Sequence, residues 1–390
     1  MGLNIHVITW LAAALYLGLL LLKAYFAMVA LKASQRPSAF VLPLGWMAEV
    51  SILQPILSGD PHLPKVLEDN LRAMAEAHFF WLIDDDDAVA QTLTQTLAKQ
   101  YPKHHIHIRC LPSAPEGTNP KSFKLQAALA DVNTRVVLVL DDDARLTAAA
   151  LEELMCALAQ GDLATALPCY REASGLGGRL LAQFVNNNAA MTYLQLLPFA
   201  SPISINGMCY ALSTQQLKAF GGFSSILKHL TDDLAMARLL RQHQARLVQS
   251  VACVEVQTGI PDLGAYVRQM HRWFLFAILL LRTQSNPMKA LIALLQGFHP
   301  WLLWLLIVLA LGFLTPSSGL ILFLVLLVRS TVLCRLQKRL TGQMRHRPLL
   351  SVISELLQPL HLLHATLQRT IRWRTRVYRV HDNDDFVSVS

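Results

Sequence analysis

The sequence predicts an α/β protein whose mostly parallel sheet belongs to a cytosolic domain, with transmembrane helices at both ends of the 390-residue chain. Short β-branched and aromatic runs alternate with helical stretches in the first half, which is typical of parallel sheets. Long apolar stretches lie near both termini. Only 15% of the residues are Asp, Glu, Lys or Arg, against about 25% in soluble proteins. This composition argues against a purely soluble or disordered chain.

Three apolar stretches predict membrane spans. Residues 7–31 are interrupted only by Lys23 and exceed the about 20 helical residues that cross a bilayer. We interpret them as an anchor rather than a signal peptide, because no basic residue precedes them and no small-residue cleavage site follows. Residues 290–314 and 319–334, separated by the turn-forming segment 315–318, predict a helical hairpin through the membrane.

Basic residues follow the first stretch, precede the second and follow the third, so all three flanks lie on the same side of the membrane as the middle region. Because Lys and Arg are retained on the cytoplasmic side, the middle region is expected in the cytosol, most simply at a bacterial inner membrane. The flanks are Lys32 and Arg36, then Arg282 and Lys289, and finally Arg335, Lys338, Arg339, Arg345 and Arg347.

The last apolar segment, residues 349–367, contains Glu355 and Pro359 and precedes a run of arginines. A fourth span would place those arginines outside, so we expect an amphipathic interface helix or a re-entrant segment. The chain is therefore expected to divide into an anchor, a cytosolic α/β domain, a transmembrane hairpin and a basic interface helix with a cytosolic tail. Their boundaries are 1–33, 34–286, 287–335 and 336–390.

The alternating pattern of the middle region assigns strands and helices in turn. Strands are predicted at residues 50–53, 79–83, 106–108 and 136–140. Helices are predicted at residues 60–77, 88–101 and 122–131. The sequence Gly-Leu-Gly-Gly at 175–178 is expected to form a loop rather than a phosphate cradle, because it does not follow a strand-to-helix fingerprint.

The net charge of +8 is concentrated near the C-terminus. Residues 335–379 contain ten Lys or Arg residues and one acid. This basic collar favours anionic lipid headgroups as partners. The net positive charge therefore no longer indicates nucleic acid as a partner. Six scattered cysteines without a C-x-x-C pair suggest neither a zinc site nor a disulfide framework.

Two predicted strands end directly in acidic clusters, residues 84–87 and 141–143. In open α/β sheets, ligands bind outside the carboxyl ends of the strands. Asp141 and Asp143 form a D-x-D whose alternate side chains leave the strand on one side, as ligands of Mg²⁺ or Mn²⁺ bridging a diphosphate would. The alternative interpretation is a pair of solvated Asp-rich turns.

Two further motifs follow. Asp232 and Asp233 open a helical stretch, where carboxylates could also serve as a simple N-terminal cap. Residues 269–273 read Gln-Met-His-Arg-Trp just before the chain returns to the membrane. An interfacial helix with a snorkelling Arg and an anchoring Trp is the alternative for that segment.

The order of acid run, D-x-D, Asp-Asp and Q-x-x-R-W resembles membrane-bound inverting glycosyltransferases of family 2, which have the Rossmann-like GT-A fold. The closer resemblance is to their ceramide glucosyltransferase-like branch, which includes bacterial hopanoid-biosynthesis glycosyltransferases. Gln54 stands where that family usually has Lys. The matching stretches are residues 50–55, 83–88, 119–121, 141–145, 206–208, 221–223, 373–375 and 378–379.

The resemblance implies a role for each motif residue. The donor-binding residues are Asp84, Asp86, Asp87, Lys121 and Asp141. Asp143 and Asp141 would hold a divalent metal, Mg²⁺ or Mn²⁺. The catalytic residues are Asp233 as the base, with Gln269, Arg272 and Trp273 closing over the diphosphate and the acceptor.

The expected activity is transfer of one sugar from a nucleotide sugar, UDP-glucose or UDP-N-acetylglucosamine, to the hydroxyl of a membrane lipid such as ceramide or a hopanoid. Sterol and diacylglycerol present a hydroxyl at the same depth. Two alternatives remain. A processive polysaccharide synthase shares Q-x-x-R-W, although three spans are few for a secretion channel. A catalytically silent membrane scaffold would use the fold only to bind a partner.

Overall fold

The computed structural model describes residues 2–34, 40–171, 174–313, 315–373 and 376–389. The chain forms two compact units. The first, here called the helical unit, comprises residues 1–35, 174–199 and 260–369. The second, the sheet unit, comprises residues 36–173, 200–259 and 370–390.

An eight-stranded sheet forms the centre of the sheet unit, in the order β3-β2-β1-β4-β7-β6-β8-β5. Its strands are β1 (Val50–Ile56), β2 (His78–Asp84), β3 (His105–Leu111), β4 (Val136–Leu140), β5 (Ala144–Arg145), β6 (Leu163–Tyr170), β7 (Cys209–Ser213) and β8 (Leu247–Val256). The four predicted strands are β1 to β4, which run parallel to one another. β7 is antiparallel to both of its neighbours, β4 and β6. The prediction of a mostly parallel sheet is confirmed.

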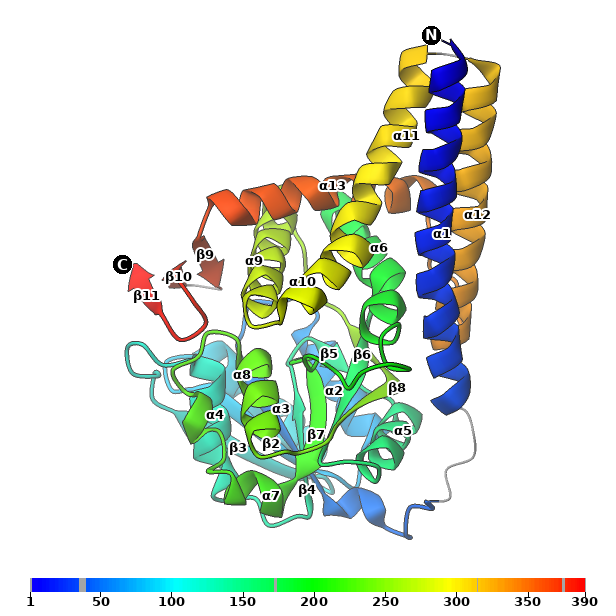
Figure 1. The fold of residues 1–390 in the computed structure, drawn as a ribbon. Coiled ribbons are helices and arrows are strands. Elements are labelled where there is room, and N and C mark those ends of the chain that lie inside the picture. The colour runs from blue at the N-terminus through cyan, green and yellow to red at the C-terminus, as the bar shows by residue number, and fades with distance from the viewer. Residues whose placement is uncertain (1, 35–39, 172–173, 314, 374–375, 390) are drawn as a thin grey trace. The chain divides into compact units, whose positions relative to one another are not determined.

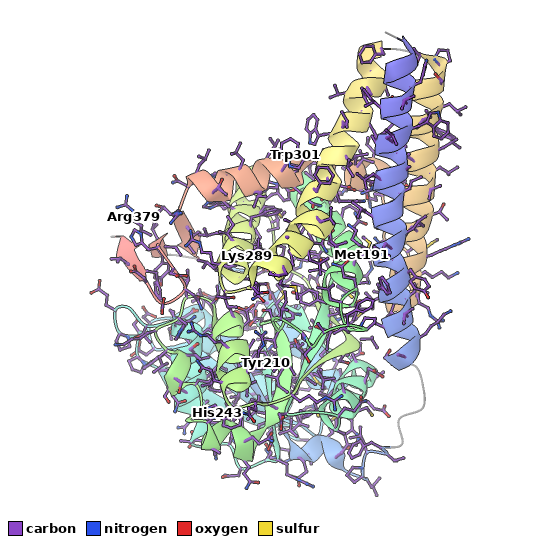
Figure 2. All side chains as sticks on the ribbon, viewed as in Figure 1. Met191, Tyr210, His243, Lys289, Trp301 and Arg379 are labelled. Atoms are coloured by element: carbon purple, nitrogen blue, oxygen red, sulfur yellow. The ribbon has the colours of Figure 1, made fainter. Side chains whose placement is uncertain are left out.

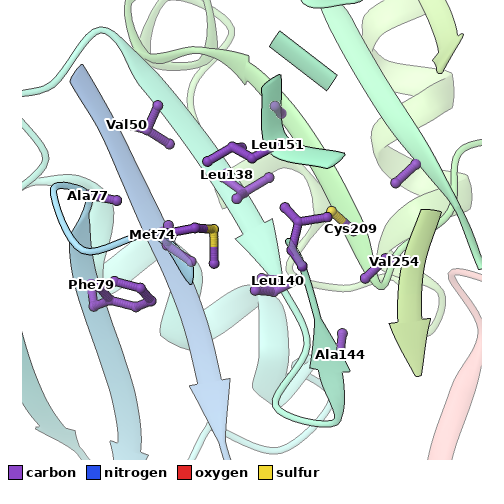
Figure 3. Close-up of a cluster of buried hydrophobic side chains, with 14 of the residues drawn as sticks. Val50, Met74, Ala77, Phe79, Leu138, Leu140, Ala144, Leu151, Cys209 and Val254 are labelled. Atoms are coloured by element: carbon purple, nitrogen blue, oxygen red, sulfur yellow. The ribbon is translucent and has the colours of Figure 1, made fainter. Parts of the chain in front are cut away.

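Helices cover both faces of this sheet (Figure 1). They are α2 (Leu63–Ala73), α3 (Ala88–Gln100), α4 (Pro120–Leu129), α5 (Ala148–Leu158), α7 (Thr214–Ala219) and α8 (Asp232–Gln242). Along β4, Leu138 and Leu140 enter one core (Figure 3) and Val137 and Val139 enter the other. Burial on both faces explains why the central strands are continuous apolar runs.

A small antiparallel sheet at the C-terminus also belongs to the sheet unit. It consists of β9 (Thr370–Trp373), β10 (Arg376–Val380) and β11 (Phe386–Val389). The sequence predicts only a tail here, because arginines interrupt the apolar pattern of these short strands. Residues 374–375, part of one family-like stretch, lie outside the described residues.

The helical unit contains α1 (Gly2–Ser34), α6 (Gly175–Tyr193), α9 (Leu263–Arg282), α10 (Asn286–Ile292), a π-helical segment (Ala293–Phe298), α11 (His299–Phe313), α12 (Pro316–Thr341) and α13 (Pro348–Leu367). Three stretches, His6–Ser34, Asn286–Phe313 and Pro316–Thr341, are long and apolar enough to cross a membrane. α1, α11 and α12 lie side by side (Figure 1). The three predicted apolar helices are confirmed.

The loop prediction for residues 175–178 is wrong, because these residues form the first turn of α6. A Cβ on Gly177 would lie 2.9 Å from the carbonyl oxygen of Asp262 and 3.1 Å from Cβ of Tyr266. The glycine therefore permits close approach of α6 to the start of α9 rather than a turn.

A buried polar cluster joins three helices of this unit. Arg329 of α12 is only 1% exposed; its Nε donates to Glu355 Oε2 at 2.7 Å and its Nη1 to Ser351 Oγ at 2.8 Å. The Tyr16 hydroxyl of α1 donates to Glu355 Oε1 at 3.1 Å. Charges among apolar helices are costly unless they are paired, so this cluster fixes α13 against α1 and α12.

Candidate active site

Asn119 organises the entrance to α4. Its Oδ1 accepts hydrogen bonds from the backbone N–H groups of Lys121 and Ser122, at 2.9 and 3.2 Å, which caps the helix. Its Nδ2 donates to the carbonyl oxygens of His229 and Leu230, at 3.0 and 2.9 Å. One buried amide therefore holds the start of α4 against the segment that leads into α8.

Lys121 brings two of the predicted acidic motifs together. Its Nζ lies 2.8 Å from Asp141 Oδ1 and 3.0 Å from Asp232 Oδ2, and it donates to the carbonyl oxygen of Gly207 at 2.7 Å. The contact with Asp232 is an ion pair without hydrogen-bond geometry. Burial alone would lower the pKa of Lys121, but Asp141 and Asp232 raise it well above its usual value. Lys121 is therefore a permanent cation between two carboxylates.

Asp233 lies in the first turn of α8 and is half-buried. Burial, together with the negative charge of Asp232, raises the pKa of Asp233 to about 7. Its Oδ1 accepts a hydrogen bond from the Leu234 N–H at 2.7 Å. A Cβ on Gly207 would lie 3.0 Å from Cβ of Asp233, so the glycine leaves room for this side chain. A carboxylate with a pKa near 7 is suited to taking a proton at neutral pH.

The D-x-D follows β4 directly and lies in the turn between β4 and β5. Asp141 and Asp143 are half-buried, whereas Asp142 between them is buried. Asp142 Oδ2 accepts a hydrogen bond from the Leu57 N–H at 2.8 Å, and Asp143 Oδ2 accepts one from the Thr258 hydroxyl. Asp142 thus supports the loop after β1, whereas Asp143 contacts the residues that follow β8.

In the first acid run, only Asp87 is buried. Its two oxygens accept hydrogen bonds from the Ala90 and Ser58 N–H groups, at 3.0 and 2.8 Å. Burial would raise its pKa, but these hydrogen bonds lower it. Asp84 pairs with Lys124 at 2.8 Å, and Asp86 is exposed. Asp87 therefore caps α3 and ties it to the loop after β1.

The described residues contain no group of three or more His, Cys, Asp and Glu side chains arranged to hold a metal ion. Asp141 and Asp143 are nevertheless half-buried carboxylates that keep part of their surface accessible. Mg²⁺ is commonly held by one or two carboxylates together with water and substrate phosphates. The two aspartates fit a hard cation that binds together with a diphosphate.

The predicted Q-x-x-R-W residues lie on α9 of the helical unit. Arg272 Nη2 donates to Gln269 Oε1, one turn earlier, at 3.0 Å. Trp273 stacks on Phe184 of α6 with 6.2 Å between ring centroids. All other predicted site residues belong to the sheet unit, so the prediction draws on both units.

Two buried residues lie near Gly207: Asn206, which the family resemblance includes without a role, and Tyr210, which sequence reasoning missed. Asn206 accepts a hydrogen bond from the Met208 N–H at 3.2 Å and donates to the carbonyl oxygen of Ala166 at 3.2 Å, which fixes the loop that presents Gly207. Tyr210 of β7 (Figure 2) is fully buried, and its hydroxyl has no hydrogen-bond partner among the described residues. Burial, and then Asp232, raise the pKa of Tyr210 well above its usual value. In the apolar sequence of β7, Tyr210 cannot be distinguished from an ordinary core residue.

Residues 8–386 match the model of glycosyl transferase family 21. The chain belongs to this family. The match confirms the predicted ceramide glucosyltransferase-like grouping, although the family is numbered 21 rather than 2. A search of curated proteins gave no match.

Solved structures resemble this family 21 glycosyltransferase at low sequence identity. A mannosyltransferase from Pyrobaculum calidifontis, in complex with GDP-Man and Mn²⁺, is 13% identical with a TM-score of 0.53, over 93% of this chain and 98% of that one. Staphylococcus aureus TarS 1–349 with UDP-GlcNAc is 11% identical with a TM-score of 0.38, over 87% and 98% of the two chains. The first of these establishes the GT-A fold, as predicted.

Proposed function

We propose that this family 21 glycosyltransferase moves one sugar from a nucleotide sugar to the hydroxyl of a membrane lipid. The contact that carries the proposal is the pairing of Lys121 with both Asp141 and Asp232. It joins the D-x-D, the expected donor site, to the acidic pair that contains the expected base, Asp233. The expected donor site and the expected base are thus linked within the sheet unit.

In the proposed reaction, the acceptor hydroxyl oxygen bonds to the anomeric carbon as the bond from that carbon to the diphosphate breaks. The hydroxyl proton passes to Asp233, and the nucleoside diphosphate leaves. With a pKa of about 7, Asp233 is a stronger base than an ordinary carboxylate and is still substantially ionised at neutral pH. Inversion at the anomeric carbon follows from the single displacement.

The donor side of the proposal uses the remaining acids of the sheet unit. Asp141 and Asp143 would hold Mg²⁺ or Mn²⁺, which when bound neutralises the charge of the diphosphate. The Mn²⁺ and GDP-Man in the mannosyltransferase structure support this assignment. The nucleoside is assigned to the acid run of Asp84, Asp86 and Asp87, where the Asp87 cap sets the position of the run.

The family resemblance assigns the diphosphate and the acceptor to Gln269, Arg272 and Trp273. A guanidinium is suited to a developing negative charge, because it stays protonated and binds phosphate oxygens bidentately. The hydrogen bond from Arg272 to Gln269 restricts the orientation that the guanidinium can adopt on α9.

A lipid acceptor and an anionic membrane surface are supported by α13. Its polar residues Ser351, Glu355 and His361 are buried in the helical unit, whereas the leucines on its other side are exposed. These are Leu349, Leu360, Leu363 and Leu367. An outward apolar face is expected of a helix that lies in lipid, and the arginines that flank it favour anionic headgroups. Together with the basic flanks of the spans, this supports a cytosolic catalytic domain at the membrane surface.

A product assay tests the proposal. The full-length protein in detergent is incubated with Mn²⁺, with UDP-glucose, UDP-N-acetylglucosamine or GDP-mannose, and with ceramide, hopanoid, sterol or diacylglycerol. A lipid that carries one added sugar is expected from the wild type and not from Asp233→Asn, and the exposed Asp384→Asn is the matched control. A long polymer would indicate a polysaccharide synthase, and neither transfer nor donor hydrolysis would indicate a scaffold.

A further inference from the structure

The turn between β10 and β11 contacts the start of α8, which carries the proposed base. Asn383 in this turn is 9% exposed. Its Oδ1 accepts hydrogen bonds from the Thr231 N–H at 2.8 Å and from the Thr231 hydroxyl at 2.6 Å, across 152 residues of chain. Its carbonyl oxygen accepts a third from the Leu230 N–H at 2.7 Å. The C-terminal tail is therefore tied to the residue just before Asp232.

These contacts hold the residue at which α8 begins. Thr231 is the N-cap residue of α8, where a Thr hydroxyl ordinarily accepts a hydrogen bond from an amide in the first turn. The Thr231 side chain makes no such bond; its hydroxyl donates to Asn383 Oδ1. The tail therefore contributes hydrogen bonds that hold this helix start in place.

A second asparagine holds the same segment through other atoms. Asn119 Nδ2 donates to the carbonyl oxygens of His229 and Leu230, while Asn383 accepts from the N–H groups of Leu230 and Thr231. Carbonyl oxygens and N–H groups of the segment before Asp232 therefore both have buried hydrogen-bond partners. A shift of this segment would move Asp233 and the ion pair of Asp232 together.

The turn that carries Asn383 is itself held by hydrogen bonds. The Asn383 N–H donates to Asp382 Oδ1 at 2.8 Å, and the N–H groups of His381 and Asp382 donate to the carbonyl oxygen of Asp385 at 2.9 and 3.0 Å. The flanking residues Val380 and Phe386 pair across the two strands. The small C-terminal sheet thus presents Asn383 from a closed hairpin.

We propose that Asn383 is a positioning residue for sugar transfer, which fixes the N-terminus of α8 so that Asp233 meets the acceptor hydroxyl. The proposal rests on the role of Asp233 stated above. In this role Asn383 acts through Thr231, to which its side chain is hydrogen-bonded. It gives the C-terminal sheet a function in the reaction.

The test measures kcat and the KM for the nucleotide sugar of full-length variants in detergent, with the nucleotide sugar varied and the acceptor saturating. Asn383→Ala is expected to lower kcat about 10²-fold, the usual scale for a small displacement of a catalytic group, with KM for the nucleotide sugar unchanged. Thr231→Val, which removes the hydroxyl but keeps the shape, should lower kcat in the same way, and Thr231→Ser should restore it. Asp384→Ala, in the same turn but exposed, is the matched control and should leave kcat unchanged.

Wild-type kcat in either Asn383→Ala or Thr231→Val would overturn the proposal, as would equal losses in Thr231→Val and Thr231→Ser. If Asn383→Ala does not fold, the two Thr231 variants decide the outcome. Failure of the underlying function gives a different result, because Asp233→Asn would then keep full activity. Hydrogen exchange adds a readout without catalysis: the Thr231 amide should exchange faster in Asn383→Ala than in Asp384→Ala.

Discussion

The pKa of Asp233 should control how the transfer rate depends on pH. Burial and the neighbouring charge of Asp232 raise this pKa to about 7. A general base acts in its ionised form, so kcat/KM should rise with pH through about 7 and become constant above it. The ordinary carboxylate value of 3.8 would instead leave the rate unchanged over the neutral range.

The size of the effect follows from that pKa. With a pKa near 7, the ionised fraction is roughly 0.9 at pH 8 and roughly 0.1 at pH 6, so kcat/KM should fall about tenfold between these values. Replacing Asp232 with Asn removes a negative charge that raises the pKa of Asp233. The acidic limb of this variant should therefore move to lower pH, whereas Asp384→Asn, in the exposed turn, should leave it in place.

The assay measures kcat/KM from pH 5.5 to 8.5 at constant ionic strength with saturating metal, because kcat/KM reports ionisations of the free enzyme. Lipid product is quantified by mass, and the integrity of the protein at each pH is checked by returning samples to pH 8. A flat profile between pH 6 and 8 would refute the reasoning. So would an Asp232→Asn profile whose limb coincides with that of the wild type.

Three further predictions concern the metal, the bridging lysine and the helical unit. Chelation with EDTA should stop transfer and added Mn²⁺ should restore it; full turnover in EDTA would remove Asp143 from the ligand role. Lys121→Met leaves two carboxylates without their cation and should reduce kcat/KM at least 10²-fold, so near-normal activity would exclude the bridge. Arg329→Leu leaves Glu355 buried without its partner and should cost about 3–5 kcal/mol; an unchanged thermal midpoint in detergent would contradict this.

The sequence predicts those parts of the fold that depend on local patterns. The β4 strand is recognisable because both of its faces are buried. The exit of Asp141 and Asp143 on one side stays a prediction, because both residues lie in the turn after the strand. The predicted helix 60–77 is longer than α2, which spans Leu63–Ala73. Asp60 accounts for the late start, because its oxygens accept hydrogen bonds from the His62 and Gly259 N–H groups, at 2.8 and 2.6 Å.

Contacts between distant parts of the chain account for what was missed. No local pattern shows that Lys121 pairs with Asp232, or that Asn383 binds Thr231, because the partners meet only after the sheet and the tail have folded. The insertion of β7 as an antiparallel strand has the same origin. Donor binding by Asp87 remains a proposal. The structure shows in addition that the Asp87 carboxylate caps α3.

Sugar transfer to a membrane lipid with Asp233 as the base is tested most directly by mass spectrometry of cellular lipids. Lipids from cells that express the wild type or Asp233→Asn are compared with those from cells that lack the protein. We expect a lipid heavier by one hexose or one N-acetylhexosamine in cells that express the wild type. This lipid should be absent from cells that express Asp233→Asn at the same protein level. The same glycolipid at equal abundance with both proteins, or no new glycolipid with the wild type, would contradict this expectation.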